Sequence, residues 1–303
     1  MQLDYYTLDV FTDRRFGGNP LAVVSAADGL AHDQMQAIAR EFNLSETVFL
    51  LGPQNPAHSA RMRIFTPTME LPFAGHPIVG TAALLAERRL GDAFSGGEAL
   101  IVLELEAGIV RVGVRLRSEG PTFAEFDAPR LPVEAGSLPP RDVLAAGLGL
   151  IPSEIGFENH RPVCYAAGQA FAFIPIAGWD ALARAHVNGA HWAAAFQDQG
   201  LVGAYLYTRQ CEHTGSAFQA RMFAPQAGVP EDPATGSAAV CLAAVIQRFD
   251  QLPDGTHRRT IEQGFQMGRP SFISLVLEVD GEQLAGVRIG GHVVRIGQGT
   301  LTV

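Results

Sequence analysis

Residues 63–90, RIFTPTMELPFAGHPIVGTAALLAERRL, hold the pattern that decides the fold, because the chain repeats it. The second copy spans residues 220–249 and reads ARMFAPQAGVPEDPATGSAAVCLAAVIQRF. Phe65 matches Phe223 at an offset of 158 residues, and GTAA in the first copy matches GSAA in the second at an offset of 156. An offset near half of the chain predicts a duplicated domain, and each copy reads strand, loop and helix.

Both copies end in a helix that lacks a polar face. The first reads IVGTAALLA over residues 78–86, and the second runs from Gly236 to Ile246. A helix without a polar face must be surrounded by protein, and its small residues keep it slim enough for strands to close around it. We therefore expect an α+β protein of two pseudo-symmetric lobes, each a β-barrel-like sheet wrapped around a central apolar helix.

Strand patterns dominate the remaining sequence. Short β-branched or aromatic runs predict strands at 3–11, 21–25, 47–51, 61–65, 100–105, 162–175, 202–208 and 217–223. The other expected elements are helices at 33–42 and 141–147, and a β-meander from Ser271 with turns at 280–281 and 290–291. We place the first lobe at residues 1–120, to which 292–303 can return, and the second lobe at 121–291.

Composition excludes several classes of partner. The chain has 303 residues, of which 47% are hydrophobic and 17% charged, as in a compact protein with large buried interiors. Its net charge is −9 and it has no cluster of basic residues, so we expect neither a nucleic-acid nor a membrane partner. The apolar stretches are too short to span a bilayer and no leader is visible, so a cytoplasmic location is expected.

Neither a metal nor a cofactor is expected from the motifs. The sequence GLGLIP at 147–152 lacks the third glycine and the flanking strand and helix of a dinucleotide site. The histidines are isolated, and Cys164, Cys211 and Cys241 lack the spacing of a zinc site or a disulfide framework.

The two helix starts are the first candidates for function. His76 and Asp232 each precede a proline, which is typical of a helix cap followed by a first turn. Capping alone explains Asp232 well, whereas histidine is a poorer cap. A buried helix N-terminus also offers free N–H groups and a positive dipole end to a carboxylate or an enolate. Gly75, Gly236 and Ser237 would let backbone amides and a hydroxyl approach such a group.

Glu46 and Asn19 are candidates at the ends of predicted strands. Glu46 stands in NLSETVFL, before an apolar strand. A single glutamate is most often an exposed turn residue, but one at the mouth of an apolar strand is partly desolvated. Desolvation raises its pKa toward neutrality and suits it to abstract and return a proton. Asn19 follows two glycines in FGGNPLAVV, where local sequence favours a turn residue.

Four segments, FTDRRFGGNPLAVV, NLSETVFL, FTPTMELPFAGHPIVGTAALL and PEDPATGSAA, resemble in order the signatures of the PhzF-like (phenazine biosynthesis-like) isomerase family. The resemblance covers nearly the whole chain. It implies a diaminopimelate-epimerase-like fold with the active site between two lobes, a C-terminal strand that returns to the first lobe, and a homodimer.

The resemblance also implies a role for each candidate residue. Glu46 would be the acid/base in an allylic or tautomeric isomerisation of a small anionic, carboxylate-bearing metabolite. His76 and Asp232 would orient this substrate and assist proton movement, while Gly75 and Ser237 would hold its carboxylate or ring substituents. We group the candidates as catalytic (Glu46, His76, Asp232) and substrate-binding (Asn19, Gly75, Gly236, Ser237).

Two other functions are considered. A racemase or epimerase of the same fold would use Glu46 and a second group from opposite faces. Diaminopimelate epimerases and proline racemases, however, have a cysteine at the start of each central helix, and neither helix start has one here; Cys241 lies inside its helix and is interpreted as packing. A non-catalytic small-molecule-binding protein would have no need of a base such as Glu46.

Overall fold

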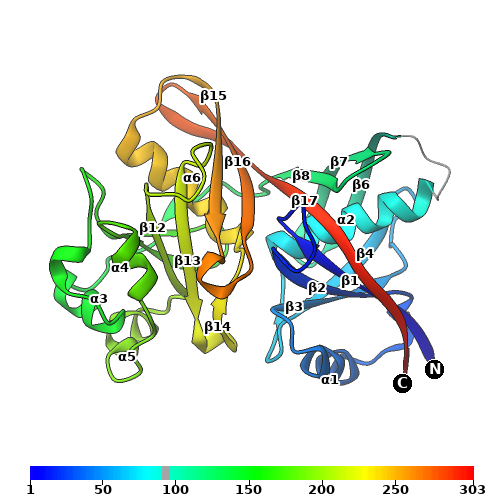
Figure 1. Ribbon diagram of the computed structural model, residues 1–303. Helices are drawn as coiled ribbons and strands as arrows, with labels where there is room; N and C mark the ends of the chain where they lie inside the picture. The colour runs from blue at the N-terminus through cyan, green and yellow to red at the C-terminus, as the bar shows by residue number, and fades with distance from the viewer. Residues whose placement is uncertain (91–95) are drawn as a thin grey trace. The chain divides into compact units, whose positions relative to one another are not determined.

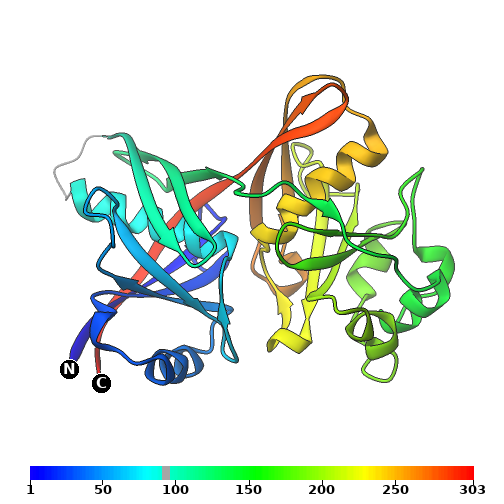
Figure 2. The ribbon, with the colours of Figure 1, turned by 180° about the vertical axis from the view of Figure 1, so that it is seen from behind.

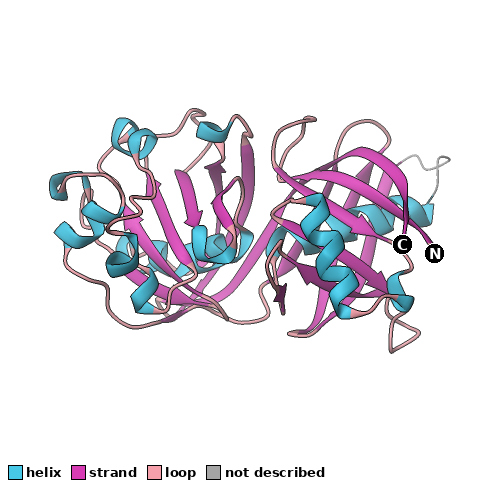
Figure 3. Cartoon of the chain, turned by 90° about the horizontal axis from the view of Figure 1, so that it is seen from below, coloured by secondary structure: helices cyan, strands magenta, loops and turns pink. Residues whose placement is uncertain are grey.

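The structure, a computed structural model, describes residues 1–90 and 96–303 and divides into two compact units. The first unit comprises Met1–Pro129 and Gly290–Val303, and the second comprises Arg130–Ile289. Strands dominate both units and helices are few, as expected of a sheet-rich α+β protein (Figure 3). The lobe boundaries predicted at 120/121 and 291/292 remain a prediction.

The first unit contains most of the N-terminal elements. Its strands are β1 (Gln2–Val10), β2 (Asn19–Val24), β3 (Glu46–Leu51), β4 (Ala60–Phe65), β5 (Glu70–Leu71), β6 (Gly96–Leu105), β7 (Gly108–Arg117) and β8 (Thr122–Asp127), joined by the end of β17 (Gln283–Thr302). Its helices are η1 (Ala27–Gly29), α1 (His32–Phe42) and α2 (Gly75–Leu90).

The strand pairings of the first unit form a closed series. β1 pairs antiparallel with both β17 and β2, and β2 runs parallel to β3. β4 is antiparallel to β3 and β5 and parallel to β6, which continues antiparallel to β7 and then β8. β8 pairs in turn with β17, so the series returns to the strand where it began.

Helix α2 is packed against the strands of this series. Its residues from Gly75 to Leu84 are buried, and it contacts β1, β2, β3, β6, β7 and β8 (Figure 1). Gly80 shows why the helix must be slim: a Cβ atom there would lie 2.6 Å from Leu21 Cδ2 and 2.7 Å from Val10 Cγ2. The absence of a polar face, read from the sequence, therefore agrees with the burial of this helix from Gly75 to Leu84.

The second unit contains the remaining elements. Its strands are β9 (Val133–Glu134), β10 (Val163–Ala166), β11 (Ala170–Pro175), β12 (Gly203–Thr208), β13 (Phe218–Ala224), β14 (Val229–Asp232), β15 (Gly255–Gln263) and β16 (Ser271–Asp280). Its helices are α3 (Arg141–Gly147), η2 (Pro152–Glu154), α4 (Trp179–Arg184), α5 (Trp192–Ala195), η3 (Gln197–Gln199), η4 (Pro225–Ala227), α6 (Gly236–Asp250) and η5 (Phe265–Met267).

The second unit repeats the pairing order of the first. The pairs β10–β11, β11–β12, β12–β13, β13–β14, β13–β15 and β15–β16 are antiparallel, parallel, antiparallel, antiparallel, parallel and antiparallel. The first unit has this same order in β1–β2, β2–β3, β3–β4, β4–β5, β4–β6 and β6–β7. Helix α6 follows β14 as α2 follows β5, and both helices lie at the repeated sequence (Figure 2).

The C-terminal strand corrects one prediction. The turn expected at residues 280–281 occurs one residue later, at Gly281 and Glu282, but β17 passes through Gly290 and Gly291 without turning. These glycines instead permit close packing: a Cβ atom at Gly290 would lie 2.6 Å from Glu125 Cβ, and one at Gly291 would lie 2.4 Å from Phe11 Cδ1. β17 then runs beside β1, so both termini of the chain lie together (Figures 1 and 2).

Candidate active site

Three predicted site residues meet in the first unit. Glu46 is the first residue of β3, Asn19 is the first residue of β2, and His76 is the second residue of α2. Because β2 and β3 are parallel, with Leu21 opposite Glu46, both strands begin at the same edge of the sheet. Glu46 Oε2 lies 3.4 Å from His76 Nδ1, and Asn19 Nδ2 lies 3.2 Å from that same nitrogen.

Asn19 is not the turn residue that local sequence suggested. It is fully buried and opens β2 opposite Val10. The turn occupies the preceding position, where Gly18 has a φ of +64° and a Cβ atom would lie 2.3 Å from the carbonyl oxygen of Val10. The glycine thus brings the chain close to β1, and the asparagine side chain is left to contact His76.

Burial fixes the protonation state of His76. Its side chain is 3% exposed, and this desolvation lowers its pKa from 6.5 to about 3, against the opposing effect of the Pro20 backbone. His76 is therefore neutral near pH 7. Its Nδ1 lies within reach of both the Asn19 amide and the Glu46 carboxylate, and the ring tautomer decides which of these two contacts is a hydrogen bond. The contact between His76 and Glu46 is thus not an ion pair.

Asp232 lies in a second polar cluster, within the second unit. It is 9% exposed and ends β14, and its Oδ2 accepts a hydrogen bond of 2.6 Å from the Thr235 hydroxyl. Gln263 at the end of β15 donates to the Asp232 carbonyl at 2.7 Å and to the Thr235 hydroxyl at 3.0 Å. Its Oε1 accepts from the Thr235 N–H at 3.1 Å. Sequence reasoning missed Gln263, because nothing local marks it.

The capping interpretation of Asp232 is wrong. Helix α6 begins at Gly236, so Thr235 occupies the cap position and Asp232 precedes it on a strand. The Thr235 hydroxyl does not cap the helix and instead donates to Asp232. Asp232 is therefore held as an acceptor beside the helix start, and capping does not account for its presence.

The remaining candidates lie at the two helix starts. Gly75 is the first residue of α2, while Gly236 and Ser237 are the first two residues of α6. N–H groups in a first helical turn have no acceptor within their helix and can bind an anion. The described units thus hold Asn19, Glu46, Gly75 and His76 in one cluster, and Asp232, Gly236 and Ser237 in the other. That both clusters act on one substrate remains a prediction.

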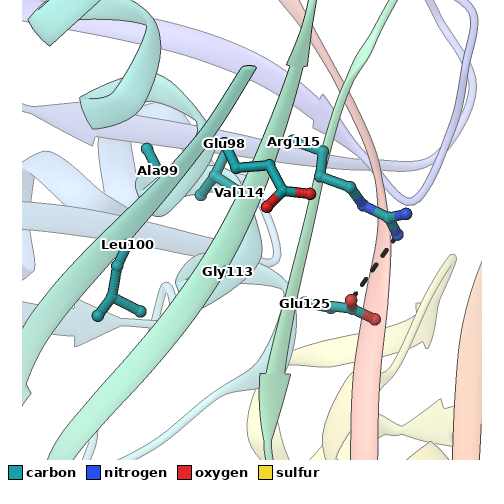
Figure 4. A pocket seen from close by; sticks show the side chains of 7 residues that line it. All are labelled: Glu98, Ala99, Leu100, Gly113, Val114, Arg115 and Glu125. Atoms are coloured by element: carbon teal, nitrogen blue, oxygen red, sulfur yellow. Dashed lines mark ion pairs between the residues drawn. The ribbon is translucent and has the colours of Figure 1, made fainter.

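A separate hollow of about 410 Å³ lies on the first unit, over β6, β7 and β8 (Figure 4). It is lined by Glu98, Leu100 and Arg115 among others, and Arg115 lies 3.7 Å from Glu125. Among the described residues that line it, none is a predicted site residue.

Within residues 1–90 and 96–303, no helix is long and apolar enough to cross a membrane. The same residues contain no group of three or more His, Cys, Asp or Glu placed to hold a metal ion.

Comparison with known proteins identifies relatives along the whole chain. The model of the family described as phenazine biosynthesis-like protein matches residues 8–299. A Mesorhizobium japonicum protein named as an uncharacterized isomerase is 47% identical over 99% of both chains. The trans-2,3-dihydro-3-hydroxyanthranilate isomerase of Pseudomonas chlororaphis is 36% identical, again over 99% of both chains.

A solved structure extends the likeness to the fold. The Bacillus anthracis phenazine biosynthesis protein of the PhzF family matches with a TM-score of 0.88 over 100% of both chains, at 24% sequence identity. The resemblance read from the four motifs is thereby confirmed. The chain belongs to the phenazine biosynthesis-like (PhzF) family, and it is an isomerase.

Proposed function

We propose that this isomerase moves a proton within a small carboxylate-bearing metabolite and that Glu46 carries the proton. The observation that carries the proposal is the 3.4 Å contact between Glu46 Oε2 and Nδ1 of His76. Because burial keeps His76 neutral, the imidazole positions the carboxylate without neutralising it. The Glu46 side chain is 14% exposed, whereas the rest of β3 is buried, so Glu46 is the residue of this strand that a substrate can reach.

The proposed step conserves all atoms. The Glu46 carboxylate removes a proton from one carbon, and the electron pair left behind shifts through a conjugated system. The same carboxyl group then returns the proton to a different carbon, so that a double bond changes place. Negative charge that develops on the substrate would be stabilised by first-turn N–H groups at Gly75, Gly236 and Ser237, with Asp232 and Asn19 orienting the substrate.

The internal repeat supports a mechanism that uses a single catalytic carboxylate. Pairing places Thr47 opposite Phe65 in the first unit and Ala204 opposite Phe223 in the second. Since Phe65 and Phe223 are equivalent in the repeat, Gly203 stands where Glu46 stands. A Cβ atom at Gly203 would lie 2.3 Å from the Phe223 carbonyl oxygen, so this position has no room for any side chain. The second unit therefore cannot supply a matching base from this position.

The cysteines do not favour a two-thiol racemisation. Cys241 lies within α6 and is fully buried, and desolvation raises its pKa to about 12. Desolvation likewise raises the pKa of Cys164 to about 11 and that of Cys211 to about 12. A thiol acts as a base only as thiolate, so these groups are poorly suited to proton abstraction near pH 7.

The relatives suggest the first substrate to test. Several are named trans-2,3-dihydro-3-hydroxyanthranilate isomerases, and this compound bears a carboxylate as the proposal requires. The closed pairing series of the first unit and the repetition of its pairing order in the second also support the proposal that each unit is a barrel around its helix. The expected homodimer remains a prediction.

Deuterium uptake tests the role of Glu46. The wild type is incubated in heavy water with trans-2,3-dihydro-3-hydroxyanthranilate, and uptake at carbon is followed by NMR. We expect uptake by the wild type and its loss in Glu46→Gln, which has no basic carboxylate. The matched control is Glu41→Gln, an exposed glutamate at the end of α1, which should exchange like the wild type. Deuterium uptake that continues unchanged in Glu46→Gln would contradict the proposed acid/base role of Glu46.

A further inference from the structure

Tyr205 on β12 has a buried hydroxyl that forms no hydrogen bond with the rest of the described chain. The residue is fully buried, and its hydroxyl makes no hydrogen bond with another described residue. Folding rarely leaves a buried hydroxyl in this state, because the group gives up its bonds to water and gains nothing in return. The packing of the strand therefore does not explain why a hydroxyl group, rather than an apolar group, is buried at this position.

Strand register places Tyr205 in one row with Asp232. Tyr205 is opposite Met222 on β13, and Met222 is opposite Asp232 on β14. Residues opposite one another across neighbouring strands point to the same face of a sheet, so the phenol and the carboxylate share a face. Burial chiefly, and the charge of Asp232 in addition, raise the pKa of Tyr205. The hydroxyl thus stays protonated and can donate to an acceptor nearby.

Tyr207 shows that a buried tyrosine on this face of the sheet can form a hydrogen bond within the protein. It lies two residues further along β12, and its hydroxyl is 2.9 Å from Nδ1 of His160. The other ring nitrogen of His160 is 2.9 Å from Asp250 Oδ1, which completes a buried chain of hydrogen bonds. Of these two tyrosines of one strand, the one in a row with Asp232 is the one whose hydroxyl makes no hydrogen bond with another described residue.

We propose that the Tyr205 hydroxyl donates a hydrogen bond to a neutral oxygen, a hydroxyl or carbonyl, of the bound substrate. The inference deepens the proposed function and rests on it. A neutral oxygen is favoured over a second carboxylate because Asp232 on the same face would repel a negative charge. A substrate hydroxyl fits best, since it accepts from Tyr205 and can also donate to Asp232. Tyr205 then determines specificity, as sites built to bond a hydroxyl reject analogues that lack it.

Two probes that differ by one hydroxyl test this role. Dissociation constants of 3-hydroxyanthranilate and anthranilate are measured by calorimetry for the wild type, Tyr205→Phe and Tyr207→Phe. One hydrogen bond predicts that the wild type prefers 3-hydroxyanthranilate by roughly five- to tenfold. The preference should vanish in Tyr205→Phe and persist in Tyr207→Phe. A preference that survives in Tyr205→Phe overturns the proposal and leaves a bridging water as the explanation of the orphan hydroxyl.

Melting temperatures give a readout that does not need the probes. Tyr205→Phe removes no hydrogen bond found among residues 1–90 and 96–303, so its melting temperature should equal or exceed that of the wild type. Tyr207→Phe loses the bond to His160 and should melt several degrees lower. If Tyr205→Phe melts as low as Tyr207→Phe, its hydroxyl has a partner in the folded chain and the proposal falls. If the wild type binds neither probe, the proposed substrate class is wrong, and Tyr205 is judged by melting alone.

Discussion

Gly203→Ala is expected to destabilise the second unit, because this position touches backbone. The added Cβ would lie 2.3 Å from the Phe223 carbonyl oxygen, 2.6 Å from Met222 Cε and 3.1 Å from Ala224 Cβ. Carbon and carbonyl oxygen ordinarily approach no closer than about 3.3 Å, so β12 and β13 must separate locally by about 1 Å. The Met222 side chain can turn aside, but the carbonyl belongs to the ladder that joins the two strands.

Two opposing effects decide how far the free energy of unfolding changes in Gly203→Ala. Overpacking of a filled site costs about 1–3 kcal/mol. Replacing glycine by alanine also restricts the unfolded chain, which stabilises the protein by about 0.4–1 kcal/mol. The clash with backbone outweighs this gain, and we expect the free energy of unfolding of Gly203→Ala to fall by about 1–2 kcal/mol.

Urea denaturation followed by circular dichroism measures this change. The matched control is Gly215→Ala, where an added Cβ meets nothing within 4 Å. The control should keep the wild-type free energy of unfolding or exceed it by about 0.4–1 kcal/mol. If Gly203→Ala is as stable as Gly215→Ala, the position has room for a side chain. The argument that the second unit cannot carry a counterpart of Glu46 would then fail.

Two further predictions concern titratable groups. Glu104 accepts hydrogen bonds from the N–H groups of Asn55 and Gln54, which lower its pKa to about 2, so its stabilisation is present above pH 4.5 and is lost as the pH falls toward 2. Glu104→Gln should be less stable in urea at pH 7 and show a flatter acid dependence, whereas wild-type-like curves would contradict the assigned bonds. Cys241 should resist a thiol reagent at pH 8 until urea is added, since burial raises its pKa to about 12. Fast native labelling that disappears in Cys241→Ala would disprove this.

The sequence predicted the elements whose signal is local. Helices expected at 33–42 and 141–147 occur as His32–Phe42 and Arg141–Gly147. The burial of α2 and α6 followed from side chains that offer no polar face, which is a property of each helix alone. β7 was overlooked although its alternation of buried and exposed residues is regular, so the signal was present in the sequence.

Other features depend on contacts far along the chain, and local sequence could not reveal them. Gly290 and Gly291 have the composition of a turn, and only the approach of Glu125 and Phe11 shows that they pack instead. The cap of α6 was expected at Asp232, whereas the helix begins at Gly236 and Thr235 occupies the cap position. Gln263, at the end of β15, binds both Asp232 and Thr235, and this long-range contact holds Asp232 beside the helix start.

The two units share one order of strand pairing but differ in the side chains at equivalent positions. One contact explains much of this difference. In the first unit the edge of β3 bears Glu46, next to a buried neutral imidazole. At the equivalent edge of β12, Gly203 lies so close to the β13 backbone that no side chain fits. A carboxylate could appear there only if two paired strands moved apart. In the proposed mechanism, backbone packing confines the base to one unit, and the other unit would contribute groups such as Tyr205 and Asp232.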